Sequence, residues 1–309
     1  MFIRQIHYLL ALAKTQHFGR AAEISHVSQP SLSTAILHLE EELGITIIKR
    51  GQRFQGFTEE GERILQWAQV LANNWESLKQ TARQAQHQLT GTLRFGAIPT
   101  TLAVTPSITR PIQAECPGIS INLVSLCAEE LIRQLDQYEL DLGLTYLDDP
   151  RLKGFNIQPL YRERHVLLAL RPDHSLLKRE LNWLEIAELP LCLLTPNMQN
   201  RRLIDGAFRD ACIKPNIVLE TDSIFALYSH VRSGLYSVVP HSMLNVAQYQ
   251  PDIVAIPLYP ALTREVGLII RRQDMLSPIQ DVAWRIAQTL ELQQHFDKLM
   301  SAQIDNVMS

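Results

Sequence analysis

Residues 18–44 (FGRAAEISHVSQPSLSTAILHLEEELG) constrain the fold most, because they predict two short helices joined by a tight turn. Ser28 is a favourable N-cap for the second helix, since its hydroxyl can accept a hydrogen bond from a first-turn N–H. Gly44 is placed to end that helix as a left-handed C-cap. Between these two caps, apolar residues at spacings of four, three and four predict one buried face: Leu32, Ile36, Leu39 and Leu43. A helix-turn-helix presents its second helix to the DNA major groove in this way.

The other face of the second helix is polar. Short polar groups near a helix N-terminus can reach base edges and phosphates. The candidates on this face are Gln29, Ser31, Ser33, Thr34 and His38. The alternative is an amphipathic helix whose polar face is simply solvated, and this helix alone does not decide between the two.

The flanking segments favour a DNA-binding domain. An earlier helix over residues 2–14 supplies an apolar face, and Ala21 and Ala22 are small enough for a close helix crossing. Residues 45–48 predict a short strand that is followed by a basic loop and a return at Phe57, which together form a wing. Arg50 and Arg53 in that loop are expected over the phosphate backbone, although exposed arginines also serve solubility alone.

These segments carry a family resemblance. The run AAEISHVSQPSLSTAILHLEEELGITIIKR and the later Thr58-x-x-Gly61 pattern resemble the winged helix-turn-helix of the LysR-type transcriptional regulators. The resemblance extends over nearly the whole chain. It implies DNA contacts by five residues of the second helix: Gln29, Pro30, Ser33, Thr34 and His38. It also implies double-stranded operator DNA as a partner and allows contact with RNA polymerase.

Residues 59–89 predict one long helix, capped by Thr58. Apolar residues alternate spacings of four and three along it, at Ile64, Ala68, Leu71, Trp75, Leu78, Ala82, Ala85 and Leu89. A 3.5-residue repeat is typical of a coiled-coil seam. At ~1.5 Å per residue the helix is too long for the small head domain to cover, so we expect a second copy of the chain. Packing against the chain's own core is the alternative.

Strands and helices alternate from Leu93 onward, which predicts an α/β class for the chain overall. Three domains are expected: a DNA-binding domain over 1–58, a linker helix over 59–90 and an effector-binding domain over 91–309. By resemblance, the last domain is similar to a type 2 periplasmic binding protein. Its first subdomain would span about 91–162 and 268–309, and its second about 163–267. A homodimer or homotetramer is the expected assembly.

Polar residues follow several predicted strands, where open α/β sheets bind ligands. The effector-binding candidates are Thr100, Thr101, Thr145, Tyr146, Thr195, Asn197, Arg202 and Phe225. Hydroxyls and N–H groups at helix N-termini favour a small anionic effector. Taken singly, each hydroxyl is better explained by helix capping, and the two aromatic residues are either pocket walls or core. Their convergence at strand ends, together with the family resemblance, favours an effector pocket.

Other functions find less support. The chain has four cysteines, Cys116, Cys127, Cys192 and Cys212, without metal-ligand spacing, and they suit buried thiols in a reducing cytoplasm. A redox-responsive transcription factor that uses cysteine oxidation is one alternative, and a ligand sensor without transcriptional output is another. No catalytic or cofactor motif appears, so neither an enzyme nor a bound cofactor is expected. The sequence also lacks an apolar run of ~18 residues, so no membrane contact is expected.

Overall fold

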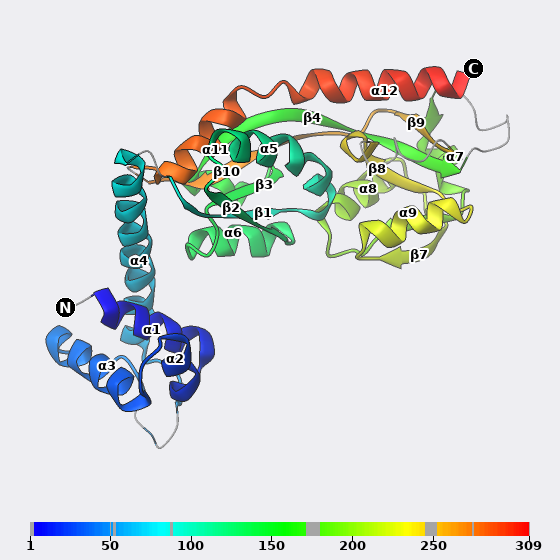
Figure 1. Ribbon diagram of the computed structural model, residues 1–309. Coiled ribbons are helices and arrows are strands. Elements are labelled where there is room, and N and C mark those ends of the chain that lie inside the picture. Colours follow the sequence, from blue (N-terminus) through cyan, green and yellow to red (C-terminus); the bar gives the residue numbers. More distant parts are fainter. Residues whose placement is uncertain are drawn as a thin grey trace. The chain divides into compact units, whose positions relative to one another are not determined.

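The computed structural model describes residues 3–49, 51, 54–86, 89–170, 180–244, 252–273 and 275–308. It divides into two units, residues 1–89 and residues 90–309, and each is described by itself (Figure 1). Four helices form most of the first unit: α1 (Ile3–Thr15), α2 (Phe18–Ile24), α3 (Gln29–Leu43) and α4 (Glu59–Ala85). Their common core contains the fully buried side chains Leu9, Leu12, Ala21, Leu32, Leu39 and Ile47.

The predicted buried face of α3 is right for three of its four residues. Leu32, Ile36 and Leu39 are buried, but Leu43 is 41% exposed. Leu43 occupies the last turn before Gly44, which adopts the left-handed conformation (φ +70°) and turns the chain away from the helix. The core therefore ends one turn before the helix does.

The apolar seam predicted on α4 is divided between two surfaces. Ala68 is buried in the core of the first unit, and Ile64, Leu65 and Ala72 pack against that core. The prediction that a second chain covers the seam is therefore wrong for its N-terminal part, because α1 of the same chain packs against it. Further apolar side chains of α4 remain exposed in the single chain: Trp67, Leu71, Trp75 and Leu78.

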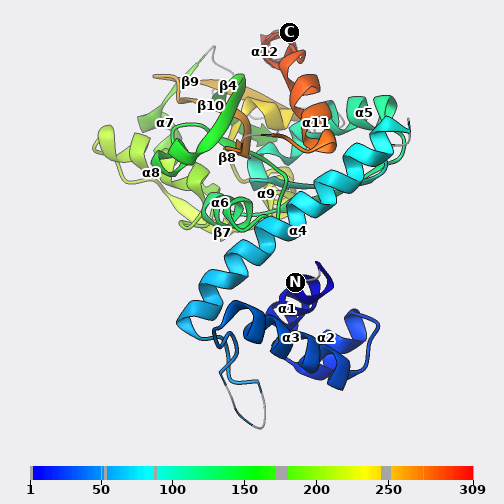
Figure 2. The ribbon, with the colours of Figure 1, turned by 90° about the vertical axis from the view of Figure 1, so that its left-hand side faces the viewer.

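The second unit begins with an α/β segment that has helices on both faces of its sheet. Its elements are β1 (Gly91–Ala97), η1 (Pro99–Val104), α5 (Thr105–Glu115), β2 (Ile119–Ser125), α6 (Ala128–Asp136), β3 (Leu142–Tyr146), η2 (Pro150–Gly154) and β4 (Phe155–Leu170). Helices α5 and α11 (Pro278–Gln288) lie together on one face, and α6 lies on the other (Figures 1 and 2). We call this part, with β10 (Thr263–Arg271) and residues 155–164 of β4, the first lobe.

The remaining elements build a second lobe around residues 165–170 of β4. They are β5 (Leu181–Asn182), α7 (Trp183–Ala187), β6 (Leu191–Leu194), α8 (Gln199–Asp210), β7 (Ile217–Thr221), α9 (Ile224–Arg232), β8 (Ser237–Pro240), η3 (His241–Met243) and β9 (Ile253–Tyr259). The main sheet runs β2-β1-β3-β10-β4-β9-β5 with β8 also paired to β4, and β6 pairs with β7. The final helix, α12 (Leu292–Met308), packs along β9 and β4.

Strand β4 passes through both lobes. Its residues up to Arg164 pair with β10, whereas those from His165 onward pair with β8. The sequence pattern predicts a strand only over 165–170, and Pro159 in the earlier part is disfavoured inside a sheet. The structure accommodates Pro159 opposite Gly267, where the register between the two strands shifts.

The sequence pattern predicts one helix near residues 278–300, and this prediction is wrong, because the helix is interrupted at residues 289–291 between α11 and α12. Thr289 caps the end of α11. The new direction of α12 places Phe296 in a buried position, with its ring centroid 4.7 Å from that of Tyr161.

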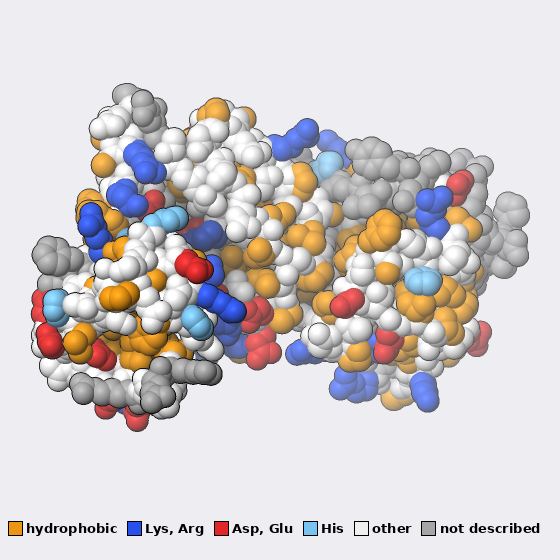
Figure 3. All heavy atoms as spheres, turned by 60° about the horizontal axis from the view of Figure 1, so that its bottom comes forward, with side chains coloured by type: hydrophobic (Ala, Val, Ile, Leu, Met, Phe, Trp, Pro, Cys, Tyr) orange, Lys and Arg blue, Asp and Glu red, His pale blue; other side chains and the backbone are white. Residues whose placement is uncertain are grey.

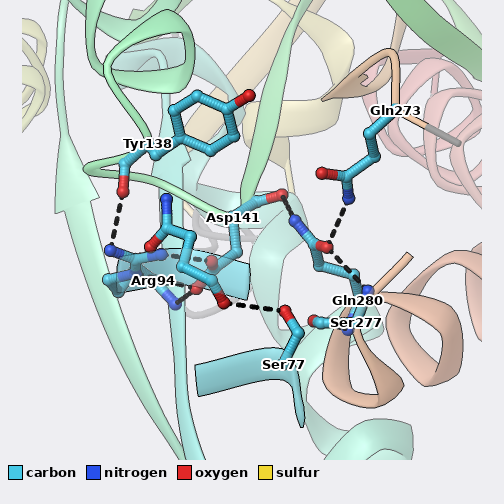
Figure 4. A network of polar contacts seen from close by, with 8 residues as sticks. Ser77, Arg94, Tyr138, Asp141, Gln273, Ser277 and Gln280 are labelled. Atoms are coloured by element: carbon cyan, nitrogen blue, oxygen red, sulfur yellow. Dashed lines mark hydrogen bonds and ion pairs between the residues drawn. The ribbon is translucent and has the colours of Figure 1, made fainter. Parts of the chain in front are cut away.

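A polar network ties α11 to the strands of the first lobe (Figure 4). Arg94 on β1 donates to both carboxylate oxygens of Asp141, at 3.0 and 2.5 Å, and to the carbonyl of Tyr138. Gln280, near the start of α11, donates to the carbonyl of Asp141 at 3.1 Å. Ser277 and Gln280 also form a capping box. Because these bonds join β1, α11 and the start of β3, they hold the first lobe together as one body.

Candidate DNA interface and effector cleft

Helix α3 has the caps that its sequence predicts. The hydroxyl of Ser28 accepts a hydrogen bond from the Ser31 N–H at 3.3 Å, and Pro30 lies in the first turn. Gly44 supplies the C-cap. These caps fix both ends of the helix, so the polar face between them has a defined orientation on the head domain.

The predicted DNA-contact residues lie on one outer face of α3. Gln29, Pro30, Ser31, Thr34 and His38 are exposed, and Ser33 is half-buried. Leu37 is 44% exposed on the same helix and was missed, because an apolar side chain inside an apolar pattern looks like core. An exposed leucine beside polar side chains is suited to contact the methyl group of thymine.

The wing is fixed from two sides. Glu40 of α3 accepts hydrogen bonds from the N–H groups of Ile47 and Ile48 through one oxygen, at 2.6 and 2.9 Å. Thr58 donates to the carbonyl of Thr46 at 2.6 Å and accepts from Gly61 at 2.9 Å. The predicted strand is reduced to a single bridge between Ile48 and Phe57, flanked by backbone bonds from Lys49 to Gly56 at 3.0 Å and from Thr58 to Ile47 at 2.9 Å.

The phosphate-contact arginines of the wing, Arg50 and Arg53, lie outside the described residues. Lys49 is described, is exposed and stands at the base of the wing. Arg20 on α2 is also exposed. Neither cation was among the predicted contacts, since isolated basic residues carry no pattern in a sequence. Both add positive charge to the surface of the head domain.

Two of the predicted effector residues come together where the lobes meet. The hydroxyls of Thr100 and Tyr146 lie 3.2 Å apart, and both side chains are buried. Gln199 and Asn200, at the start of α8 in the second lobe, line the same cavity. Its volume is about 10 Å³, which leaves room for roughly one water molecule. In this conformation the two lobes are closed over Thr100.

The other predicted hydroxyls have different roles. Thr101 donates to the carbonyl of Ile98 at 2.9 Å, a local bond at the start of η1 and not the helix cap that the sequence allowed. The hydroxyl oxygens of Thr145 and Thr195 are buried without a hydrogen-bond partner among the described residues. Asn197 is exposed, and its carbonyl accepts from Arg202 at 2.9 Å, so Arg202 stays at the surface.

A larger groove opens beside the closed cavity. It has a volume of about 630 Å³ and is lined from both lobes by Pro99, Leu102, Ser125, Asp222, Ser223, Ile224, Phe225, Tyr228, Ser229 and Arg232. Phe225 is 82% exposed although it is aromatic. Hydrophobic side chains gather on the face that carries α9 and β7 (Figure 3). The volume is within the range of small-molecule sites, which are commonly apolar with a few polar groups.

Positive charge is scarce around both cavities. Arg201 is buried, but it is paired with Asp205 and Glu220 at 2.7 Å each. Among the described lining residues of the two cavities, only Arg232 carries a positive charge. An anionic group in the groove would therefore have Arg232 as its charged partner, while Asp222 would disfavour a second negative group.

Two family models match this chain. The model of the bacterial regulatory helix-turn-helix protein of the lysR family matches residues 3–62, and the model of the LysR substrate binding domain matches residues 86–290. The chain belongs to the LysR family of transcriptional regulators. The predicted α/β class, the winged helix-turn-helix and the regulator function are confirmed. This LysR-type protein is a regulator and not an enzyme.

Similar proteins cover almost the full length. The DNA-binding transcriptional dual regulator OxyR of Escherichia coli is 29% identical over 306 residues, which is 97% of this chain and 99% of OxyR. EstR of Acinetobacter baylyi is 28% identical over 301 residues, 93% of this chain and 98% of EstR. A full-length OxyR variant from Pseudomonas aeruginosa has 26% identity and a TM-score of 0.73, covering 94% and 99% of the two chains.

The fold is also that of CbnR complexed with its target DNA, with 22% identity, a TM-score of 0.64 and coverage of 93% and 99%. LysR regulators bind operator DNA, oligomerise and respond to small molecules, so these three kinds of partner are supported for this LysR-type regulator. No helix within the described ranges is both long and apolar enough to cross a membrane.

The cysteines of this LysR-type regulator differ in their surroundings. All four thiols are free. Cys192 is buried on β6, and burial raises the pKa of its thiol to about 11. Burial also raises the pKa of Cys116, with the neighbouring Glu115 adding to the effect. Cys127 and Cys212 are exposed, and Cys127 lines the closed cavity with Thr100. Cys127 is therefore the one thiol placed at the predicted effector site.

Proposed function

We propose that this LysR-type regulator reads operator DNA with α3 and its wing. Gln29, Ser33, Thr34 and His38 contact base edges, while Arg50 and Arg53 contact phosphates. The observation that supports this is the capped helix α3, whose apolar face is buried and whose polar face is free. Base contacts by a glutamine side chain give sequence preference, whereas phosphate contacts by arginine give salt-dependent affinity.

Selection from a random pool of duplex DNA with the full-length protein tests this proposal. Gln29→Ala should weaken binding to the selected sequence by about 1–3 kcal/mol and leave binding to scrambled DNA unchanged. Arg53→Ala should weaken both and flatten the dependence of affinity on salt. The matched control is Gln66→Ala, an exposed glutamine on α4. Unchanged affinity of the Gln29 and Arg53 variants for the selected sequence would exclude this interface.

We infer that two chains associate through α4. Trp67, Leu71 and Leu78 are exposed along this helix, at 68%, 39% and 58%. Their spacings of four and seven place them on one face. Large apolar side chains in such a row are covered in a stable assembly, and a second copy of α4 presents the same row. A homodimer through this face, with a homotetramer built from two such dimers, is the proposed assembly.

The proposed effector is a small molecule that enters between the two lobes. The groove beside Phe225 offers an apolar wall for an aromatic or aliphatic body, and Arg232 offers one positive charge. A small carboxylic acid with an apolar body matches this lining. Its binding would part the lobes around Thr100 and so change the position of the paired heads. Thermal-shift screening of aromatic and aliphatic carboxylic acids tests the proposal, and stabilisation by neutral compounds alone would contradict it.

Oxidation is a second candidate signal, favoured by the exposure of Cys127 at the closed cavity. Several relatives are named hydrogen peroxide-inducible genes activator. Here the Cys127 thiolate would attack one peroxide oxygen, the O–O bond would break, and a sulfenic acid and hydroxide would form. Mass spectrometry after peroxide treatment tests this route. A mass increase of about 16 Da (one oxygen atom) on the peptide that contains Cys127 would support it, provided that the increase is absent in Cys127→Ser and kept in Cys212→Ser.

A further inference from the structure

Glu163 is a carboxyl group buried at the crossing between the two lobes. It lies on β4, one residue before the last β10 pair and two before the first β8 pair. Its side chain has no solvent exposure. An ionised carboxylate in such a place is costly unless a cation or several hydrogen-bond donors compensate for the loss of water. The partners of Glu163 therefore decide which protonation state the closed lobes favour.

The compensation around Glu163 is incomplete. One oxygen, Oε1, accepts hydrogen bonds from Tyr161 at 3.2 Å and from Ser242 at 2.9 Å. The other oxygen, Oε2, is buried without a hydrogen-bond partner among the described residues. The cation that acts on Glu163 is already committed, since Arg264 pairs with Asp148 at 2.5 Å and its guanidinium carbon lies 4.3 Å from the ring centroid of Tyr146. Glu163 itself forms no ion pair with a described residue.

The remaining neighbours of Glu163 supply no further stabilisation of its ionised form. Tyr146 faces Glu163 from β3 and Tyr161 from β4 itself, and burial and the Glu163 charge raise the pKa of both phenols well above their usual range. His241 of η3 stands next to Ser242, and burial lowers its pKa to about 4, although Asp297 of α12 opposes this. His165 on β4 is also buried, and burial lowers its pKa. Both histidines are therefore neutral near pH 7 and supply no cation.

Burial raises the pKa of Glu163 to about 7, while the hydrogen bonds from Ser242 and Tyr161, the neighbouring Tyr146 hydroxyl and the charge of Arg264 moderate the rise. The carboxyl thus exchanges its proton close to neutral pH. Each lobe supplies part of its surroundings, since Ser242 belongs to the second lobe and Tyr146, bonded to Thr100, belongs to the first. Separation of the lobes would bring water to the carboxyl and stabilise its ionised form.

We propose that Glu163 holds a proton when the lobes are closed and releases it to water when they part, so that pH shifts the balance between the two states. Only the O–H bond of the carboxylic acid breaks, the proton passes to water, and no electron is transferred. Acid favours the closed lobes and base favours the open ones. This inference rests on the proposed effector cleft, because the lobe movement that it makes pH-dependent is the one that the effector is proposed to cause.

Infrared difference spectroscopy of the full-length protein between about pH 6 and about pH 8 tests where the proton is held. The wild-type protein should lose a protonated-carboxyl band as pH rises. The band should be absent in Glu163→Gln and kept in Glu188→Gln, an exposed glutamate of the second lobe. Ser242→Ala removes a hydrogen bond that stabilises the carboxylate, so it should move the titration to higher pH. This variant keeps the test decisive if Glu163→Gln does not fold.

Hydrogen exchange, corrected for its intrinsic pH dependence, tests the link to lobe motion. Protection of residues 160–168 and 237–243 should fall over the same pH range in the wild type and in Glu188→Gln, and stay constant in Glu163→Gln. Absence of the infrared band, or a titration of Glu163 without any change in exchange, would overturn the inference. Neither readout uses DNA or effector. A protein that passes both tests but binds no carboxylic acid would overturn the proposed effector instead.

Discussion

One carboxylate oxygen of Glu40 accepts two hydrogen bonds from the wing, of which the bond from the Ile47 N–H is 2.6 Å long. The Glu40 side chain therefore joins the helix that is proposed to read bases to the wing that is proposed to contact phosphates. This contact fixes the distance between the two DNA-binding elements, which is a requirement for simultaneous contact with a groove and its flanking backbone.

Replacement of Glu40 should therefore weaken DNA binding through the wing. Glu40→Ala leaves two N–H groups without their acceptor, which should lower the stability of the head domain by about 1–3 kcal/mol. We expect weaker binding and a flatter salt dependence, measured by fluorescence anisotropy at two salt concentrations. Glu41→Ala, at the exposed neighbouring position, is the control. Equal salt slopes for both variants would show that the wing keeps its position without Glu40.

Leu71→Glu should dissociate the proposed dimer. The change places a charge in an apolar row, which would cost several kcal/mol if that row is buried between two chains. Sedimentation velocity should show a smaller species than the wild type at equal concentration. Gln66→Glu adds the same charge at an exposed position outside the row and should keep the assembly. An unchanged assembly of Leu71→Glu would mean that α4 is not the interface.

Thr100→Val should abolish the response to a stabilising carboxylic acid. Valine keeps the shape of threonine but removes the hydroxyl 3.2 Å from Tyr146 at the closed cavity. The control is Thr105→Val, because Thr105 is equally buried but bonds locally to the carbonyl of Leu102. Thermal shifts with the acids from the screen would be compared among the three proteins. A full response in Thr100→Val would show that the hydroxyl pair at the closed cavity takes no part in the response.

Glu163→Gln should change how stability depends on pH. The native state holds this proton more tightly than the unfolded state does, since the pKa is raised from 4.5 to about 7. Stability from this group is fully present below pH 4.5 and is lost as pH rises through about 7, by an amount on the order of 3 kcal/mol. The glutamine variant lacks this loss.

His165 and His241 act in the opposite direction, because burial lowers the pKa of each and the folded state gains stability as pH rises through this range. The quantity to measure is therefore the difference in unfolding free energy between wild type and Glu163→Gln at each pH, from urea denaturation. That difference should vary between about pH 4.5 and about pH 7 and be level above it. A constant difference throughout would contradict the raised pKa.

Local signals in the sequence predicted the head domain well. The caps Ser28, Gly44 and Thr58 are set by neighbours within a few residues, so their roles follow from spacing. The α4 seam was less predictable, because the same apolar period serves a helix partner within the chain and one outside it. Ala68 lies against the chain's own core, and Leu71 does not.

The effector domain depended on contacts that spacing does not encode. Thr100 and Tyr146 were expected at strand ends, but that their hydroxyls meet is set by the pairing of β1 with β3. Glu163 was not a candidate at all. Its charged and polar neighbours in sequence, Arg162 and Arg164, make it resemble a surface residue, whereas the structure places it between the lobes with no exposure.

The unbroken course of β4 limits how this domain can move. No loop separates the two lobes along this strand, because its pairing changes from β10 to β8 between adjacent residues, Arg164 and His165. Any rotation of one lobe against the other has to be taken up as twist within a continuous strand. Ladder bonds to β10 before this crossing and to β8 and β9 after it oppose such twist, so its amplitude is bounded.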